Sequence, residues 1–370
     1  MKLQVLQEDL SKILNTSIRF VSSRQSLPIL ANFMLTAEKT KLKVQATNLE
    51  MSISMKLGAK IEEEGSVTVP AKSFVEIISN LNQGQLNLVL TKEQLKIDSL
   101  GFVANIATMP ANDFPKIPKD IDEKKSFQIP TKVLLPTLSK ILFAASNDET
   151  RPVLGGVLFI FNTNELTLVA SDGFRLSKKT ITLTKKIPGE KLNMIIPKSM
   201  LLELIKITSD EETIFFEPHQ SDNQLIIKVG DVIISTRLID GNFPDFERII
   251  PKNSSTKVVV DKNDLKRGVK LGAVFARESA NVIKLKIKEG SILLESESGK
   301  VGKENYEIEA NIVGGEVEIS FNYKFIEDFI NSVTADDLEI KLTDGSSPAI
   351  FVDPKDPDFL HLIMPVKIQG

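Results

Sequence analysis

One segment, in which an extended run turns into a short amphipathic stretch, occurs three times in this chain. Its copies cover residues 67–81, 194–207 and 319–333, a spacing of about 125 residues. Each copy has a proline or asparagine at the same place (Pro70, Pro197 and Asn322) and an acidic residue six positions later (Glu76, Glu203 and Asp328). Solenoid repeats are shorter, at roughly 20–50 residues, so the pattern predicts tandem domains of similar fold.

The length and composition agree with three globular domains. A chain of 370 residues divides into three units of about 120 residues, and each can bury its own core. Hydrophobic residues make up 42% and charged residues 26%, which is ordinary for a soluble protein. No apolar run approaches the roughly 18 residues that cross a bilayer, and the N-terminal residues lack the apolar region of a signal peptide. We therefore expect a cytoplasmic protein that does not contact membranes.

Within each unit the pattern indicates a strand, an amphipathic helix, several short strands and then the repeated helix. Residues 8–23 have apolar side chains at helical spacing. The expected N-cap of the corresponding helix is Thr131 in the second unit and Asp261 or Asn263 in the third. Alternation elsewhere is typical of half-buried strands in antiparallel hairpins.

The expected fold class is therefore α+β, with three tandem similar domains that each have two helices packed on antiparallel sheets of roughly eight short strands. Linkers that follow a Phe-Pro turn separate these domains. The expected domains cover residues 1–120, 126–250 and 256–370.

Motifs for catalysis are missing. The two histidines, His219 and His361, are far apart and are interpreted as incidental, and no phosphate-binding loop, dinucleotide-binding glycine pattern or serine-nucleophile elbow occurs. Zero cysteines exclude thiol catalysis and cysteine-ligated zinc. Turn chemistry explains the carboxylates of residues 62–64 and 353–358, and that of Asp172, better than a metal site or a catalytic acid. We expect no enzymatic activity, no metal and no cofactor.

The formal net charge of −3 leaves contact with nucleic acid open. An acidic outer surface combined with a basic inner surface would give the same total, because the distribution of charge matters more than its sum.

From end to end the chain resembles the bacterial β sliding clamps, the processivity subunits of DNA polymerase III. The resemblance rests on short motifs in the same order and threefold setting. In the first unit they are Ser26-Leu-Pro-Ile-Leu30, Thr47-Asn-Leu-Glu-Met51 and Val69-Pro-Ala-Lys72. In the second they are Ala170-Ser-Asp-Gly-Phe-Arg-Leu176 and Asp240-Gly-Asn-Phe-Pro-Asp-Phe-Glu-Arg248, and in the third Phe321-Asn, Leu342-Thr-Asp344 and Ile363-Met-Pro365.

The resemblance implies a head-to-tail homodimer of three-domain protomers that closes into a ring, with helices lining the hole and sheets outside. Such a ring encircles double-stranded DNA without reading its sequence and tethers the replicative DNA polymerase for processive synthesis. It also implies that the polymerase, the clamp loader, other polymerases and mismatch-repair proteins dock short linear peptides in a pocket between the second and third domains.

The resemblance further implies which residues form these sites. The positions that match the peptide pocket are Leu154, Ser171, Gly173, Phe174, Arg175, Leu176, Pro244, Arg248, Ile249, Asn322, Phe325, Ser347, Leu362, Met364, Pro365 and Val366. The favoured DNA-facing residues are Arg24, Lys72 and Lys198, chosen among helix basic residues that include Lys12, Arg19, Lys140, Lys206, Arg267 and Lys324. Candidates for the core of the dimer interface are Ile106, Val274 and Phe275. Ordinary core packing or solvated helix positions are the alternative explanation for these residues.

The chain departs from the family pattern at several positions. Phe174 and Phe325 stand where a polar-tipped aromatic residue is common, Lys367 replaces a usual arginine, and residues 368–370 extend past the typical end. We therefore expect the preferred docking motif to differ in detail.

Two other classes of protein stay open. An adaptor with the same pocket would bind peptides without encircling DNA and would be a monomer or an open array. An enzyme would need chemistry from residues that give no motif signal. The oligomeric state separates the clamp from the adaptor.

Overall fold

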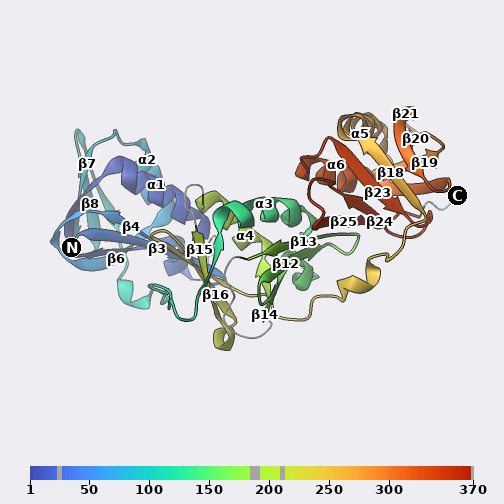
Figure 1. Ribbon diagram of the computed structural model, residues 1–370. Coiled ribbons are helices and arrows are strands. Elements are labelled where there is room, and N and C mark those ends of the chain that lie inside the picture. The colour runs from blue at the N-terminus through green and yellow to red at the C-terminus, as the bar shows by residue number, and fades with distance from the viewer. Residues whose placement is uncertain (23–26, 184–191, 209–212, 368–370) are drawn as a thin grey trace. The chain divides into compact units, whose positions relative to one another are not determined.

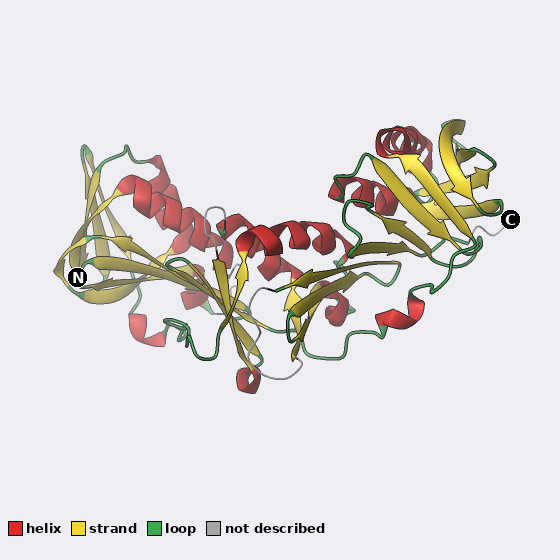
Figure 2. Cartoon of the chain, in the orientation of Figure 1, coloured by secondary structure: helices red, strands yellow, loops and turns green. Residues whose placement is uncertain are grey.

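The structure is a computed structural model that describes residues 1–22, 27–183, 192–208 and 213–367. The chain forms two compact units. Unit 1 consists of residues 1–131 and 202–238, and unit 2 of residues 132–201 and 239–370. Figures 1 and 2 show their helices and strands. None of the helices in these described ranges is long and apolar enough to cross a membrane.

The order of elements recurs three times, and each repeat has two α-helices among its described residues. Repeat 1 consists of β1 (Lys2–Leu6), α1 (Gln7–Ser17), β2 (Asn32–Glu38), β3 (Lys41–Thr47), β4 (Met51–Gly58), β5 (Lys60–Glu63), β6 (Gly65–Pro70), α2 (Ala71–Asn80), β7 (Gln85–Thr91), β8 (Gln94–Ser99) and β9 (Phe102–Ala107). Repeat 2 consists of β10 (Phe127–Pro130), α3 (Thr131–Ile141), β11 (Gly156–Asn162), β12 (Glu165–Ser171), β13 (Arg175–Thr182), β14 (Leu192–Pro197), α4 (Lys198–Ile207), β15 (Thr213–His219), β16 (Gln224–Val229) and β17 (Val232–Arg237). Repeat 3 consists of β18 (Thr256–Asp261), α5 (Lys262–Ala276), β19 (Val282–Lys288), β20 (Ser291–Ser298), β21 (Gly302–Val313), β22 (Val317–Asn322), α6 (Tyr323–Ser332), β23 (Asp337–Leu342), β24 (Ala349–Val352) and β25 (Phe359–Ile363). The α+β repeat expected from the sequence is confirmed.

The repeated segment forms the same strand-to-helix corner in each repeat: β6 leads into α2, β14 into α4 and β22 into α6. Pro70 and Asn322 are N-caps with nearly the same backbone angles, φ −57° and ψ 112° against φ −67° and ψ 116°. Asn322 also accepts a hydrogen bond from the backbone N–H of Lys324 at 3.1 Å. Proline and asparagine therefore serve the same corner, because both suit the backbone before the first helical turn.

The repeats also share strand topology. The first strand of each pairs antiparallel with the strand after its second helix, so β1 pairs with β7, β10 with β15 and β18 with β23. Unit 1 contains a five-stranded sheet in the order β5-β1-β7-β8-β9 and an eight-stranded sheet in the order β10-β15-β16-β17-β4-β3-β2-β6. Unit 2 contains a twelve-stranded sheet in the order β14-β11-β12-β13-β25-β24-β23-β18-β21-β20-β19-β22.

The helices cover the sheets with their apolar faces, as Figure 2 shows within each unit. In unit 1, α1 contacts α2, β3 and β4, and it buries Leu10 and Leu14 completely. In unit 2, α5 contacts α6 and strands β19 to β21, and α6 buries Ile326 and Phe329 completely. Burying each such side chain stabilises the fold by about 1.5–3 kcal/mol.

Two local expectations need correction. The first helix was expected to continue to residue 23, but α1 ends at Ser17 and a 3-10 turn covers Ile18–Phe20. The chain leaves helical geometry at Val21, whose backbone is extended (φ −83°, ψ 142°), and Ser23 lies outside the described residues. Thr131 is the first residue of α3, and its Oγ1 is buried without a hydrogen-bond partner, so its assignment as an N-cap was wrong.

The N-cap expected for the third unit is confirmed. Asp261 caps α5 by accepting hydrogen bonds from the backbone N–H groups of Asn263 and Asp264, at 2.8 and 2.9 Å. The alternative cap, Asn263, lies inside the helix.

Strand pairing joins successive repeats, and it does so twice in the same register. In unit 1, β17 of repeat 2 pairs with β4 of repeat 1, and the third residues of the two strands, Ile234 and Ile53, lie opposite each other. In unit 2, β25 of repeat 3 pairs with β13 of repeat 2, and the third residues are His361 and Ser177. All four side chains are fully buried. The junctions are therefore two copies of one interface.

His361 is structural, contrary to its interpretation as incidental. Its Nδ1 lies 2.8 Å from the Ser177 hydroxyl, and its ring stacks on Phe329 with 5.6 Å between the ring centroids. Burial, helped by the nearby Arg175 cation, lowers the pKa of His361 to about 3. The imidazole is therefore neutral at neutral pH.

We predict that this histidine makes stability depend on pH. A histidine in an unfolded chain has a pKa of about 6.5, so between that pH and about 3 the unfolded state binds a proton that the folded state does not. Stability is then lost as the pH falls, by up to about 1.4 kcal/mol per pH unit. His361→Leu lacks this proton uptake, so any stability advantage of the unsubstituted protein should shrink by about 2 kcal/mol between pH 7 and pH 4.5 in urea unfolding. A difference that does not vary with pH would contradict the prediction.

Candidate peptide-docking site

A cavity of about 200 Å³ opens in unit 2 beside the junction of β13 with β25. Its walls come from the β12–β13 hairpin, the segment around the 3-10 turn Phe246–Ile249 and the last residues of β25. The lining residues are Leu154, Ser171, Gly173, Arg175, Leu176, Phe243, Pro244, Asp245, Phe246, Ile249, Leu362 and Met364.

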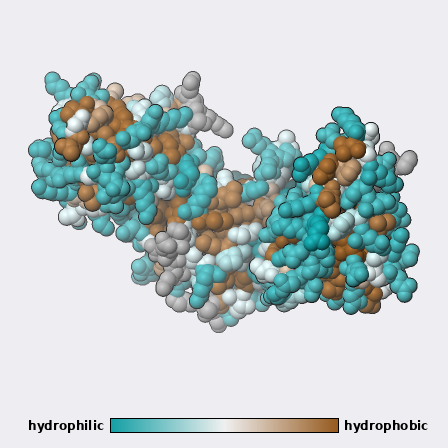
Figure 3. All heavy atoms as spheres, turned by 90° about the horizontal axis from the view of Figure 1, so that it is seen from above, coloured by the Kyte–Doolittle hydropathy of each residue, from teal (hydrophilic) through white to brown (hydrophobic). Residues whose placement is uncertain are grey.

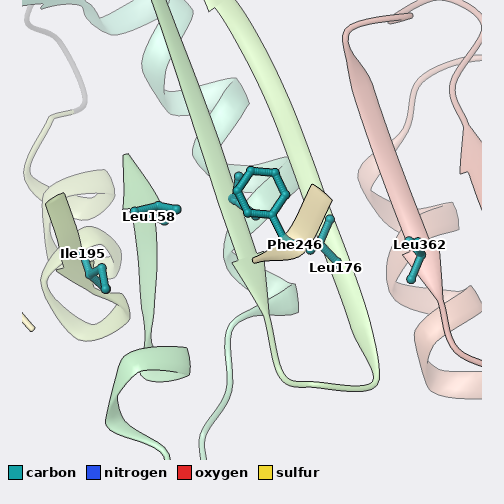
Figure 4. Packing of buried hydrophobic residues seen from close by; sticks show 6 residues of the cluster. Leu158, Leu176, Ile195, Phe246 and Leu362 are labelled. Carbon is teal, nitrogen blue, oxygen red and sulfur yellow. The ribbon is translucent and has the colours of Figure 1, made fainter. Parts of the chain in front are cut away.

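The floor of the cavity is continuous with a hydrophobic core. Leu176, Phe246 and Leu362 line the cavity and also belong to a buried cluster with Leu158 and Ile195, shown in Figure 4. Met364 packs against the edge of this cluster. The site is therefore an apolar slot with a rigid floor and a flexible thioether at its rim, which suits apolar side chains of different shape.

The hairpin wall is built by the motif Ser171-Asp-Gly-Phe-Arg175. Asp172 Oδ1 accepts hydrogen bonds from the backbone N–H groups of Phe174 and Arg175, at 2.9 and 3.0 Å. The Ser171 hydroxyl donates to the Arg175 carbonyl and accepts from the Gly173 N–H, at 2.7 and 3.0 Å. Gly173 has φ +91°, which glycine adopts without strain. The local sequence alone therefore fixes this wall.

A side chain at Gly173 would also require the end of the Arg151 side chain to move. A Cβ atom on this residue would lie 2.8 Å from the guanidinium of Arg151. That guanidinium is held in place by Asp148, whose carboxylate accepts from Arg151 Nε at 3.0 Å.

Arg175 is engaged by the protein itself. Its guanidinium donates to the carboxylates of Asp172 and Asp328 at 3.0 and 2.6 Å and to the Phe143 carbonyl at 2.6 Å. It also stacks on the ring of Phe325, 4.5 Å from the centroid. Asp172 belongs to repeat 2, and Asp328 and Phe325 belong to repeat 3. Arg175 therefore fixes the wall of the slot.

The cavity brings together nine of the sixteen residues expected in the pocket: Leu154, Ser171, Gly173, Arg175, Leu176, Pro244, Ile249, Leu362 and Met364. It adds Phe243, Asp245 and Phe246, which sequence reasoning missed. The repeated Phe-Pro turn already marked Phe243, and the family motif of residues 240–248 spanned all three. A signal for them was therefore present.

Seven expected residues lie outside the cavity lining. Phe174 is 59% exposed, and its carbonyl accepts from the Met364 N–H at 2.9 Å, so it borders the rim. The Val366 N–H donates to the Ser320 carbonyl, which anchors the C-terminal segment that includes Pro365. Arg248 is exposed and forms an ion pair with Asp245, and Asn322 caps α6. The ring of Phe325 stacks under the guanidinium of Arg175. The Ser347 hydroxyl donates a hydrogen bond to Asp344.

The expected DNA-facing residues differ in exposure and in their contacts within the protein. Arg24 lies outside the described residues. Lys72 is exposed in the first turn of α2. Lys198 is partly buried at the start of α4 and donates to the Ala145 carbonyl and to Asn147 Oδ1, each at 3.0 Å.

Burial, and then the charge of Arg175, lower the pKa of Lys198. This lysine is therefore mostly committed to contacts within unit 2.

The other helix basic residues fall into two groups. Ion pairs engage Arg19 and Lys206 with Glu203, Lys140 with Asp353 and Asp356, and Arg267 with Asp264. Lys12, Lys72 and Lys324 are exposed and form no ion pair with any described residue. These three are the most available to a phosphate.

The residues expected at a dimer interface lie on two elements with exposed apolar side chains. Ile106 is partly exposed on β9, where Val103 is 60% exposed. Val274 on α5 is 52% exposed, with Phe275 and Leu271 beside it. In the view of Figure 3, hydrophobic patches interrupt a mainly hydrophilic surface.

Three family models match the chain in succession. They are the N-terminal, central and C-terminal domains of the DNA polymerase III beta subunit, matched by residues 1–118, 128–245 and 247–367. A beta sliding clamp from Staphylococcus aureus is 32% identical over 368 residues, which cover 96% of each chain.

Solved structures agree with these matches. The sliding clamp of Bacillus subtilis has a TM-score of 0.95 at 28% identity, and a sliding clamp from Pseudomonas aeruginosa bound to griselimycin has 0.93 at 25% identity. Each alignment covers 100% of both chains. The resemblance inferred from the motifs is thus confirmed. The three tandem matches follow the three structural repeats, and this chain belongs to the DNA polymerase III beta subunit family, the non-catalytic sliding clamps that make bacterial DNA replication processive.

Proposed function

We propose that two copies of this chain close head-to-tail into a ring around double-stranded DNA and tether the replicative polymerase there. The observation that supports this proposal is that a single chain makes only two of the strand pairings between repeats and leaves the edges for a third pairing open. The last strand of repeat 2 pairs with repeat 1, and the last strand of repeat 3 pairs with repeat 2. Among the described residues, the last strand of repeat 1 (β9) has no such partner, and neither does β21, the strand of repeat 3 that corresponds to β4 and β13.

Both free edges have the form of the internal junctions. Strand β9 is the edge of its sheet. Strand β21 pairs with β20 over residues 302–309 and with β18 over residues 310–313, so residues 302–309 have one open side. Open strand edges bind other chains readily, which makes them natural sites of assembly.

The internal register predicts the register between copies. In both internal junctions the third residues of the two strands are opposite each other. The third residues of β9 and β21 are Ala104 and Glu304. We therefore expect Ala104 of one copy opposite Glu304 of the other, with Ile106 opposite Gly302. The two edges are different surfaces, so the contact between copies is head-to-tail. Two copies form a closed ring if the rotation from one copy to the next is half a turn.

DNA inside such a ring is held by enclosure, with weak contacts to phosphates and none to bases. Lys72, together with Lys12 and Lys324, supplies exposed positive charge from three helices. Arg24 and Lys198 stay in the proposal as family-matched positions. Weak contact is consistent with sliding.

The apolar slot of unit 2 is proposed to dock short linear peptides of the polymerase, the clamp loader, other polymerases and mismatch-repair proteins. Its rigid floor, its Met364 rim and the fixed Arg175 wall support this role. The proposal includes a cytoplasmic location and domains at residues 1–120, 126–250 and 256–370.

Closure is predicted to depend on β9. Ile106→Asp places a charge in the expected interface, so gel filtration should shift from twice the chain mass toward the chain mass. After loading by its clamp loader, the unchanged protein should stay on nicked circular DNA and be lost when the DNA is linearised. Leu202→Asp, on an exposed site of α4, is the matched control. A monomeric unchanged protein that still binds peptides would favour the adaptor class.

Glu304 is predicted to oppose closure. Burial raises the pKa of its carboxyl, Ser296 donates to Oε2 at 2.9 Å, and Oε1 has no hydrogen-bond partner. The corresponding side chains at both internal junctions are fully buried, so closure should bury Glu304 further and disfavour its charge. At pH 8, Glu304→Gln should lower the dissociation constant of the dimer. The expected decrease is about tenfold for each pH unit by which ring closure raises the pKa of the Glu304 carboxyl. Sedimentation should show that this gain shrinks at pH 5, and a weaker dimer at both pH values would contradict the prediction.

Docking is predicted to depend on Met364. Met364→Ala removes an apolar side chain from the rim of the slot, and we expect a loss of about 1–2 kcal/mol, or roughly 5–30-fold in affinity, for a C-terminal peptide of the polymerase. Fluorescence anisotropy measures this loss. Val313→Ala is the control, because Val313 is an exposed apolar residue on β21 of the same unit. Unchanged affinity for Met364→Ala would refute the assignment of the slot.

A further inference from the structure

A second cavity lies in unit 1, where α1, β4 and the end of α4 meet. Its volume is about 490 Å³, within the range of about 300–1,000 Å³ that is usual for ligand pockets. Its apolar surface comes from Ile13, Met55, Leu57, Ile207 and Val232. Three lysines, Lys12, Lys56 and Lys206, line it together with a single carboxylate, Asp9. The lining of the cavity thus combines apolar side chains with an excess of positive charge.

The positive charge is only partly compensated, although Lys56 interacts electrostatically with the carboxylate of Asp120. Lys206 pairs with Glu203 at 2.8 Å, but Lys12 and Lys56 form no ion pair with the residues that the structure describes. Lys56 also lies directly opposite Lys43 in the pairing of β3 with β4. Like charges in that arrangement repel each other. An anionic group in the cavity would relieve this repulsion.

The internal repeat shows what occupies the same place in unit 2. Corresponding residues, taken by their position in equivalent elements, are Thr16 of α1 and Lys140 of α3, Met55 of β4 and Lys179 of β13, and Val232 of β17 and Phe359 of β25. In unit 2 these residues surround the six-residue loop 353–358, which connects β24 to β25.

That loop inserts a carboxylate between the two lysines. Asp356 accepts hydrogen bonds from Lys140 Nζ at 2.6 Å and from Lys179 Nζ. Lys140 also lies 3.3 Å from the carboxylate of Asp353 and 5.4 Å from the ring centroid of Phe359. An acidic turn followed by an apolar side chain therefore fills the site in unit 2.

Unit 1 has no equivalent loop. Strands β16 and β17 are joined by the two residues 230–231, and Asp231 is exposed and does not line the cavity. We infer that the unit 1 cavity binds an acidic, turn-forming segment of a partner protein. The counterparts of Lys140 and Lys179 in unit 1, Thr16 and Met55, are uncharged, so the carboxylate of that segment is held instead by Lys12, one helical turn before Thr16, and by Lys56, next to Met55. An adjacent apolar side chain packs on Met55 and Val232. A peptide fits better than a phosphate backbone, because five of the lining residues are apolar and the corresponding place in unit 2 is filled by peptide.

The cavity is separate from the contacts that close the ring and from the apolar slot, and it shares only Lys12 with the residues proposed to face DNA. Its lining residues all belong to unit 1, and binding there does not require closure. Dimer mass, retention on nicked DNA and peptide affinity of the slot test the proposed function without reference to this cavity.

The chain supplies its own probe. A blocked synthetic peptide with the sequence of residues 352–359, Val-Asp-Pro-Lys-Asp-Pro-Asp-Phe, mimics the loop of unit 2. The full chain, labelled with ¹³C at its methionine methyl groups, is titrated with this peptide. We expect the methyl signal of Met55 to shift and that of Met364, in the other unit, to stay in place. A peptide with asparagine at the three aspartate positions should bind about tenfold more weakly, because charge-assisted hydrogen bonds are lost.

Lysine-to-glutamine substitutions test which side chains of the cavity bind the carboxylate of the peptide. Lys12→Gln combined with Lys56→Gln should weaken the peptide about tenfold or more. Lys92→Gln combined with Lys288→Gln, two exposed lysines that do not line the cavity, is the charge-matched control and should change nothing. No shift of Met55 at millimolar peptide would overturn the inference. It would also be overturned if a short linear DNA duplex shifted Met55 at lower concentration than the peptide, since the cavity would then be a phosphate site.

Discussion

Antiparallel pairing between the last strand of one repeat and the preceding repeat is the constraint on which the functional surfaces depend. Side chains alternate between the two faces of a strand, so a slip of one residue would move every side chain of the pair to the other face. In unit 2 this pairing sets Arg175 opposite Ile363 and Leu176 opposite Leu362. Those residues then form the wall and floor of the apolar slot, with Met364 one step further along. The slot is therefore a consequence of the junction register.

The same junction position is filled in three chemically different ways. In unit 1 it holds two isoleucines, Ile53 and Ile234, which need no hydrogen bond. In unit 2 it holds Ser177 and His361, whose mutual hydrogen bond allows a polar pair to be buried. The edge left open holds Glu304, whose charge is costly to bury. In the proposed ring, a carboxyl at this edge would make the contact between copies weaker than the internal junctions, because burial disfavours its charge.

The sequence was informative where structure is local. The repeated strand-to-helix corner, the Asp261 cap and the turn around Asp172 each depend on residues within a few positions of one another, so motifs and spacing predicted them. Long-range pairings were not predictable in this way. The partners of Lys140 and Lys198 come from distant loops, and only the folded chain shows that both lysines are engaged. For the same reason Arg175 was assigned to a ligand, although its guanidinium is bound by Asp328 from the next repeat.

The hairpins beside the two junctions have the same backbone hydrogen bonds and different side chains. The hairpin of residues 47–51 in repeat 1 repeats the hydrogen bonds of residues 171–175: Asn48 Oδ1 accepts from the N–H groups of Glu50 and Met51, as Asp172 does in repeat 2. Leu49 takes the place of Gly173 at φ +75°. The turn is thus conserved between repeats, and the difference lies in the side chains. A glycine there leaves room for Arg151, and arginine at the last position, where repeat 1 has Met51, reaches across to repeat 3. Two substitutions in a repeated turn therefore distinguish a wall that can hold a ligand from one that only ends a hairpin.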